Sequence, residues 1–191
     1  MKVLGLTGGI GMGKSTALEM FAALGAATWD ADEAVRRLYA PGGAGAAAVG
    51  AIRPEAVRGG AVDRAALRAW VAEDAGALPA LDAAIHPLVA ADRAAFVAGA
   101  AAPLAVCDVP LLFETGAEAG MDATATVSVP AEVQRARVLA RGTMDAAALE
   151  AILARQMTDA ERRARADYVI ETLDMEAARA DVARIHGEMT R

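Results

Sequence analysis

Several residue types are absent or scarce in this sequence, and each shortage excludes a class of site. The 191 residues include one cysteine, Cys107, which excludes an internal disulfide and a zinc site built from thiolates and fits a reducing compartment. Asparagine is absent, so the chain lacks the Asn-Lys-x-Asp motif with which specific GTPases recognise guanine. Aromatic residues make up only 4%, and Trp29 and Trp70 are too isolated to form a platform for base stacking.

Charge and apolar runs exclude further classes of protein. The 25 acidic residues outnumber the 19 basic ones, and a net charge of -6 provides no bulk positive field to attract a nucleic acid. No apolar run reaches the length of a membrane span, and the N-terminus lacks the cleavage pattern of a signal peptide. We therefore expect a cytoplasmic domain of enzyme size without a nucleic-acid or membrane partner. The sequence carries no signal of oligomeric state.

The alternation of apolar runs and helical patterns predicts an α/β fold with a parallel sheet wrapped by helices. We expect strands at residues 2–7, 26–29, 103–109, 123–129 and 166–171. We expect helices at residues 15–24, 30–40, 130–141, 145–165 and 174–189, and a mostly helical segment at 63–100 that is interrupted by Gly76, Pro79 and Pro87. The Gly/Ala-rich stretch at 42–50 is expected to be a loop or a frayed turn.

A phosphate-binding motif follows the first predicted strand. It is Gly8-Gly9-Ile10-Gly11-Met12-Gly13-Lys14-Ser15, which matches G-x-x-x-x-G-K-[ST] and is followed by a predicted helix. Glycines let successive N–H groups point at phosphate oxygens, and the helix N-terminus adds its positive dipole end. Lys14 reaches the β- and γ-phosphates, and the Ser15 hydroxyl is a ligand for Mg²⁺. The motif predicts binding of ATP or GTP, with an incidental glycine-rich turn as the alternative.

The remaining motifs favour a small-molecule kinase on a P-loop NTPase fold. The Ser-Gly-Gly signature of transporter ATPases is absent, and the chain is short for a motor or a helicase. A kinase needs a base for the acceptor hydroxyl. Asp30-Ala31-Asp32 follows the second predicted strand, at the edge of the sheet where ligands collect. One of these carboxylates takes the hydroxyl proton in this interpretation; in the alternative, both are acids at a helix N-terminus.

Arginines after residue 130 are candidates for neutralising the charge of a phosphoryl group. Arg137 and Arg141 are four residues apart and share one helical face before Gly142. A lid with such arginines would neutralise the transferred group and exclude water. We expect a solvated helix face for the other arginines of this region, which include Arg135, Arg162, Arg163 and Arg165.

Another block of interest follows the predicted strand at 103–109. Asp108 resembles a Walker B acid, which helps to hold the shell of Mg²⁺. The apolar residues 111–113, followed by Glu114, form an acceptor pocket beside the nucleotide in one interpretation and ordinary core in the other. His86 is a lone histidine on a helical stretch, and by itself it is expected to be structural.

In their order, these motifs resemble the dephospho-coenzyme A kinase family. The matching blocks run from residue 4 to about residue 170. They are Leu6 to Thr16, Asp30-Ala31-Asp32, Ile85-His86-Pro87-Leu88-Val89, Val109-Pro110-Leu111-Leu112-Phe113-Glu114, Gln134-x-x-Arg137-x-x-x-Arg141, Arg155-Gln156-Met157 and Ala166-Asp167-Tyr168-Val169-Ile170.

The resemblance implies ATP-dependent phosphorylation of the ribose 3′-hydroxyl of dephospho-CoA, the last step of coenzyme A synthesis. It implies a nucleotide-binding core at about 1–30, 101–135 and 166–191, a helical CoA-binding insert at about 31–100 and a lid at about 136–165. In this pattern Asp32 is the catalytic base, Ser15 helps to hold Mg²⁺, and Lys14 and Arg141 act on the phosphates. The implied ATP-binding residues are Gly8, Gly9, Ile10, Gly11, Met12, Gly13, Lys14, Ser15, Thr16, Arg137 and Arg141, and the implied acceptor-binding residues are Asp32, His86, Leu111, Leu112, Phe113 and Glu114.

The chain departs from the family pattern at two places. Met12 stands where a small residue is usual, and we expect its side chain to point away from phosphate. Glu171-Thr172-Leu173 replaces a usual Asn-x-Gly turn, so no nucleotide contact is carried over there. Two other functions stay open at this point: another small-molecule kinase, such as a nucleoside or nucleotide kinase, and a regulatory module driven by its nucleotide state.

Overall fold

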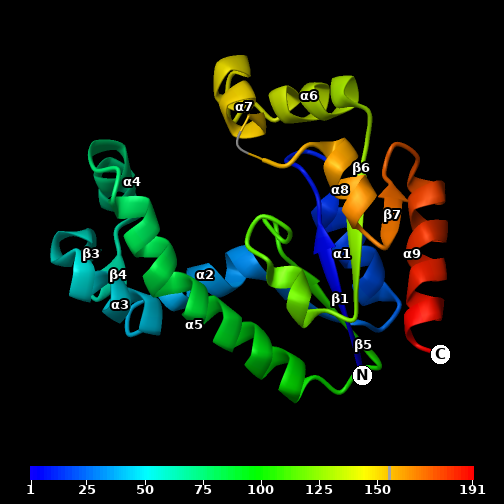
Figure 1. The fold of residues 1–191 in the computed structure, drawn as a ribbon, viewed down its shortest axis with the longest axis horizontal. Helices are drawn as coiled ribbons and strands as arrows, with labels where there is room; N and C mark the ends of the chain where they lie inside the picture. The colour runs from blue at the N-terminus through cyan, green and yellow to red at the C-terminus, as the bar shows by residue number, and fades with distance from the viewer. Residues whose placement is uncertain (155) are drawn as a thin grey trace. The chain divides into compact units, whose positions relative to one another are not determined.

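The computed structural model of the chain describes residues 1–154 and 156–191 and contains two compact units (Figure 1). The first unit consists of Met1–Trp29 and Ala100–Arg191, and the second consists of Asp30–Gly99. The second unit is therefore an insertion into the chain of the first. Arg155, which belongs to one of the motif blocks, lies outside the described residues.

A five-stranded sheet lies at the centre of the first unit, with the strand order β2-β5-β1-β6-β7. The strands are β1 (Lys2–Thr7), β2 (Ala27–Asp30), β5 (Leu104–Asp108), β6 (Ala123–Ser128) and β7 (Tyr168–Glu171). β1 pairs in parallel with β5 and β6, and β6 pairs in parallel with β7. Central parallel strands are covered on both faces, which explains why every residue of β5 is buried. The five predicted strands are confirmed, with small shifts at their ends.

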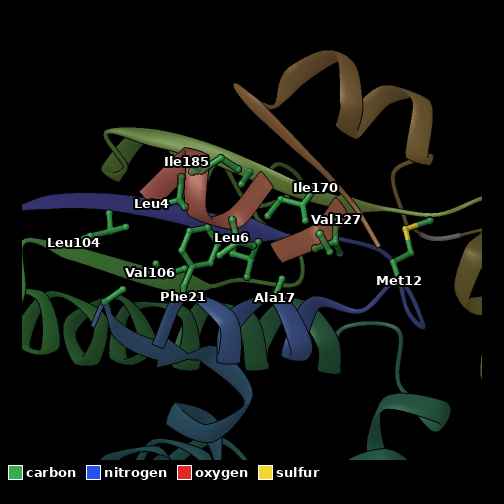
Figure 2. Packing of buried hydrophobic residues seen from close by; sticks show 14 of the residues in the cluster. Leu4, Leu6, Met12, Ala17, Phe21, Leu104, Val106, Val127, Ile170 and Ile185 are labelled. Carbon is green, nitrogen blue, oxygen red and sulfur yellow. The ribbon is translucent and has the colours of Figure 1, made fainter. Parts of the chain in front are cut away.

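Helices cover this sheet and complete its core. They are α1 (Lys14–Ala23), α6 (Ala131–Ala140), α7 (Ala146–Leu153), α8 (Asp159–Arg165) and α9 (Met175–Met189), with a short 3-10 helix, η2 (Ala117–Gly120). Figure 2 shows Phe21 of α1 packed with Leu4 and Leu6 of β1, in the same core cluster as Ile185 of α9. Gly5 faces the opposite side, because side chains alternate along a strand; there a Cβ would lie 3.0 Å from Leu112 and Met121 side-chain atoms.

The prediction of a single helical segment at 145–165 is wrong in one respect, because this region contains two helices, α7 and α8. Thr158 begins α8 with a capping box: its hydroxyl accepts from the Glu161 N–H, and the Glu161 carboxylate accepts from the Thr158 N–H. This reciprocal cap satisfies backbone donors that a continuous helix would bond to its preceding turn. It therefore stabilises a new helix start within the predicted segment.

The second unit is mostly helical. It contains α2 (Ala31–Tyr39), α3 (Ala44–Ile52), η1 (Pro54–Ala56), a hairpin of β3 (Val57–Arg58) and β4 (Ala61–Val62), α4 (Arg64–Glu73) and α5 (Ala77–Gly99). Its core contains Val49, Ala56, Leu67, Leu81 and Ile85. In the part of the chain that the structure describes, no helix is both long and apolar enough to cross a membrane.

Two predictions for this unit are wrong. The stretch at 42–50, expected to be a loop or a frayed turn, mostly lies in α3, because burial of Ala46 and Val49 outweighs the low helix propensity of its glycines. Pro79 and Pro87 were expected to interrupt the helical segment, but both lie within α5. Pro79 is in the first turn, where proline is tolerated, and Pro87 is in the interior, near Ile85 of the core. The β3–β4 hairpin was not predicted, although Gly59 and Gly60, both with positive φ, make the type of turn that such hairpins use.

The packing of Phe21 can be tested by truncation. Its side chain is fully buried against the sheet, so Phe21→Ala is expected to lower the free energy of unfolding by about 3–5 kcal/mol through lost burial and a cavity. Urea denaturation measures this loss. Leu24→Ala, at a position that is 44% exposed, is the control and should change the free energy by about 0.5 kcal/mol or less. Equal losses in the two variants would contradict the packing.

Candidate active site

The phosphate-binding motif forms the loop between β1 and α1. Gly13 precedes α1 with φ 90°, and Gly11 has φ 75°, a region that glycine adopts without strain. A Cβ on Gly11 would also lie 2.4 Å from the Val138 side chain, so no larger residue fits. No side chain of the described residues caps the first turn of α1, whose N–H groups are thus left for an anion. The loop has the backbone that its motif predicts.

Lys14 and Asp108 form an ion pair beside this loop. The Lys14 ammonium donates to Asp108 Oδ1, and the Asp108 side chain is only 2% exposed. Asp108 is the last residue of β5 and pairs in register with Leu6 of β1, which brings the two strand ends together. Because a buried carboxylate is costly without a partner, this contact holds the Lys14 side chain at the loop. The sequence-based comparison of Asp108 with a Walker B acid agrees with this position.

Two buried side chains from other elements hold carbonyl groups of the loop. Gln134 of α6 donates from Nε2 to the Ile10 carbonyl at 2.8 Å, and Thr172, just after β7, donates from its hydroxyl to the Met12 carbonyl at 2.5 Å. In a trans peptide the C=O and the following N–H point in opposite directions. Binding each carbonyl therefore directs the next N–H to the other side of the chain. The two side chains therefore fix the direction of N–H groups in the loop.

Arg162 packs against the same loop, and the expectation of a solvated position for it is wrong. It is 4% exposed; its guanidinium donates to the Met157 carbonyl, and Nη2 lies 3.7 Å from Met12 Sδ. A Cβ on Gly9 would lie 2.8 Å from Nη2. Burial lowers the pKa of Arg162, and Asp159, 3.9 Å away, opposes that shift. The other arginines expected on a solvated face are exposed and paired with carboxylates: Arg135 with Glu150, Arg163 with Glu171 and Arg165 with Glu118.

Arg137 and Arg141 line a pocket of about 180 Å³ next to the loop. Arg137 also donates from Nη2 to the Thr172 carbonyl at 2.8 Å, which ties α6 to the segment after β7. The pocket has a cationic edge beside the phosphate loop and apolar side chains elsewhere, a composition that suits the base and phosphates of a nucleotide. Its remaining lining residues are Gly11, Gly13, Thr16, Ala17, Met20, Thr172, Met175 and Ala178.

Asp32 lies in the second unit, in the first turn of α2. Asp30 caps this helix, since its Oδ1 accepts a hydrogen bond of 3.0 Å from the Glu33 N–H. The Asp32 side chain is exposed and lines an open pocket of about 520 Å³. Of the two carboxylates that the sequence left as alternatives, Asp30 is engaged in the cap and Asp32 is accessible to a substrate.

The other predicted acceptor residues have different surroundings. His86 is on α5, with Nε2 3.5 Å from Asp82 Oδ1, and it does not line the Asp32 pocket. Leu112 and Phe113 are buried, and the Arg165 guanidinium lies 4.7 Å from the centre of the Phe113 ring. Leu111 and Glu114 are exposed. The structure thus brings Gly8 to Thr16, Asp108, Arg137 and Arg141 together in the first unit, while Asp32 and His86 belong to the second.

Three residues that hold the loop had no role in the sequence interpretation. Gln134 was part of a motif block only, and its place one turn before Arg137 was the available signal. Thr172 follows the carboxyl end of β7, where ligand-binding residues of parallel sheets collect. No sequence pattern indicated that Arg162 is buried, because its burial depends on how α8 packs. Met12, expected to point away from phosphate, is buried in the core cluster (Figure 2).

A mostly parallel sheet with this loop after β1, an acid at the end of β5 and arginines beside the loop define a P-loop kinase. In agreement, the shikimate kinase of Acinetobacter baumannii has the same fold, with a TM-score of 0.57 and 17% identity, over 97% of this chain and 90% of that one. Within this class, the chain belongs to the dephospho-CoA kinase family, whose family model matches residues 2–176.

The similarity to two known proteins extends over nearly the whole chain. A dephospho-CoA kinase of Cereibacter sphaeroides is 61% identical over 179 residues, which cover 94% of this chain and 91% of that protein. The crystal structure of TT1252 from Thermus thermophilus superposes with a TM-score of 0.88 and 32% identity, over 100% of this chain and 98% of that one. The resemblance found in the motifs is therefore confirmed over nearly the whole chain.

The role of Thr172 can be tested by removing its hydroxyl. Thr172→Val leaves the Met12 carbonyl without its donor, and an unmade buried hydrogen bond costs about 1–3 kcal/mol. We expect the Kd for ATP, measured by titration calorimetry, to rise roughly five- to a hundredfold, and Thr172→Ser to restore it. Thr190→Val, at the other end of α9, removes a hydroxyl bonded to the His186 carbonyl and is the control. An unchanged Kd in Thr172→Val would show that this hydroxyl does not orient the loop.

Proposed function

We propose that this chain transfers the γ-phosphoryl group of ATP to the ribose 3′-hydroxyl of dephospho-CoA, giving coenzyme A and ADP. The observation that carries the proposal is a complete phosphate-binding loop, with Lys14 paired to Asp108, in a chain that matches the dephospho-CoA kinase family over residues 2–176. The family membership favours this acceptor over those of other small-molecule kinases. We place the reaction in the cytoplasm, with no nucleic-acid or membrane partner.

In this proposal the first unit holds the donor. Loop N–H groups and the Lys14 ammonium bind the β- and γ-phosphates, and Arg137 and Arg141 neutralise charge from the pocket beside the loop. The apolar part of that pocket takes the base of the nucleotide. We assign residues 136–165 to a lid, residues 31–100 to acceptor binding, and the rest of the chain to the nucleotide-binding core.

The residues beside Lys14 also suit a magnesium ion. Mg²⁺ prefers oxygen ligands, and the Ser15 hydroxyl in the first turn of α1 and the Asp108 carboxylate at the end of β5 are both oxygen donors. Ser15 would hold the ion, and Asp108 would help to hold its shell of water. When bound, Mg²⁺ neutralises charge on the phosphate oxygens.

Asp32 is the proposed general base. Its exposed carboxylate accepts the proton of the 3′-hydroxyl while the bond from that oxygen to the γ-phosphorus forms. The bond between the γ-phosphorus and the oxygen that bridges it to the β-phosphate breaks, and ADP leaves with the electron pair of that bond. His86, Leu111, Leu112, Phe113 and Glu114 stay proposed acceptor residues, with Leu111 and Glu114 the more exposed of the residues after β5.

Replacing Asp32 tests the assignment of the base. Asp32→Asn keeps the shape of the side chain but cannot accept the proton, so kcat with dephospho-CoA is expected to fall about a hundredfold or more, while the Kd for ATP is unchanged. A coupled ADP-release assay and a calorimetric titration measure the two quantities. Glu73→Gln, an exposed acid on α4 of the same unit and outside the pocket, is the control and should keep kcat within about twofold of the wild type. Full turnover in Asp32→Asn would reject Asp32 as the base.

Metal removal tests the magnesium assignment. Excess EDTA is expected to abolish ADP release, and added Mg²⁺ to restore it. Ser15→Ala should raise the Mg²⁺ concentration needed for half-maximal activity, because one oxygen ligand is lost, whereas Ser15→Thr should keep it near the wild-type value. Equal Mg²⁺ requirements in wild type and Ser15→Ala would show that this hydroxyl is not a ligand.

A further inference from the structure

The open pocket of the second unit is lined by an excess of positive charge. One wall is a face of α2, with Asp32, Val35, Arg36 and Tyr39 at helical spacing. The other wall is a face of α4, with Arg64, Leu67 and Arg68. Three guanidinium groups thus line the pocket together with a single carboxylate.

Two of these guanidinium groups are not neutralised by an ion pair. Arg36 lies 2.5 Å from Glu33 on its own helix. Within the described residues, no carboxylate lies at ion-pair distance from Arg64 or Arg68, and both side chains are exposed. The Arg64 guanidinium lies 5.9 Å from the centre of the Tyr39 ring, a contact that restricts its orientation.

The other groups around the pocket offset only part of this positive charge. Burial raises the pKa of Tyr39, so its phenol stays neutral. Asp63, next to Arg64, accepts hydrogen bonds from the N–H groups of Ala65 and Ala66 as the cap of α4, and its other oxygen lies 3.3 Å from Arg58. The hydrogen bonds of the cap hold the pKa of Asp63 below its usual value, and the charges of Arg58 and Arg68 lower it further. Asp63 therefore offsets part of the charge of Arg68 without lying at ion-pair distance from it.

Unpaired guanidinium groups in an open pocket are the groups that bind phosphate, because their planar donors match its oxygens. Dephospho-CoA carries its negative charge on the diphosphate at its ribose 5′-position, and the 3′-hydroxyl that accepts the phosphoryl group belongs to the same ribose. We infer that Arg64 and Arg68 bind the 5′-diphosphate of the acceptor, in the pocket whose opposite wall carries Asp32. This inference rests on the proposed function and extends it to the residues that select an acceptor with a diphosphate.

Steady-state kinetics of Arg64→Gln, Arg68→Gln and the double variant test the inference. Hydrogen bonds to charged groups are worth about 1.5–3 kcal/mol. Each single variant is therefore expected to raise the KM for dephospho-CoA about ten- to a hundredfold, with the KM for ATP unchanged. Arg68→Lys should lie between wild type and Arg68→Gln, since it keeps the charge but loses the planar fork. Arg93→Gln, on α5 of the same unit and outside the pocket, is the matched control.

A second acceptor separates binding of the diphosphate from a general effect on the unit. Adenosine has the 3′-hydroxyl and lacks the diphosphate, so its kcat/KM should be the same in wild type and in the arginine variants. Added NaCl should raise the KM for dephospho-CoA in the wild type more than in the double variant, because screening weakens only the contact that the wild type retains. Far-UV circular dichroism checks that each variant is folded.

The outcomes distinguish this inference from the function on which it rests. If the wild type phosphorylates dephospho-CoA but the variants raise its KM no more than Arg93→Gln does, the inference is overturned and the function stands. Equal losses with adenosine and dephospho-CoA would also overturn it, because they would show a structural role for the arginines. If the wild type transfers no phosphoryl group to dephospho-CoA, the proposed function itself fails.

Discussion

The direction of the peptide N–H groups between β1 and α1 decides whether this chain can bind phosphate, and the first unit is organised around that constraint. Left-handed backbone at Gly11 and Gly13 lets the loop turn, while Gln134 and Thr172 bind its carbonyl groups from the side. These two residues are more than a hundred positions away in the sequence and reach the loop because β6 pairs with β1, and β7 pairs with β6, in the sheet. The order of the strands thus determines which side chains can bind the carbonyl groups of the loop.

Contacts within the protein hold the positively charged side chains around the loop in place. Lys14 is paired with the buried Asp108, Arg137 is bonded to the segment after β7, and Arg162 is buried against Met12. Buried charges cost free energy unless they are paired and hydrogen-bonded. Charged groups that are already fixed do not have to reorganise when charge develops on a phosphoryl group. This preorganisation is the main source of electrostatic catalysis.

In the second unit, the residues that pack the core differ from those that line the pocket, apart from Leu67 and Tyr39, which contribute to both. Small and apolar residues such as Ala46 and Val49 of α3 pack its core, and Gly45 allows α3 to approach the Leu38 carbonyl, where a Cβ would lie at 2.9 Å. The charged faces of α2 and α4 line its pocket instead. Asp30 caps α2, whereas the exposed carboxylate of Asp32 lies at the edge of that pocket. These two acids, separated by Ala31, therefore have different surroundings.

Sequence alone was enough for the five strands, the phosphate-binding loop, the acid at the end of β5 and the family, because these depend on local patterns and motif order. The sequence also contains the signal for the start of α8, since Thr158 and Glu161 have capping-box spacing.

Tertiary structure decided the other features. The helix α3 exists because its alanines and Val49 are buried, and Arg162 is buried because α8 packs against the loop. The pairing of Thr172 with Met12 and the shared pocket of Asp32, Arg64 and Arg68 join residues far apart in the chain. Local sequence patterns carry no information about such contacts, since packing free energy between distant segments sets them.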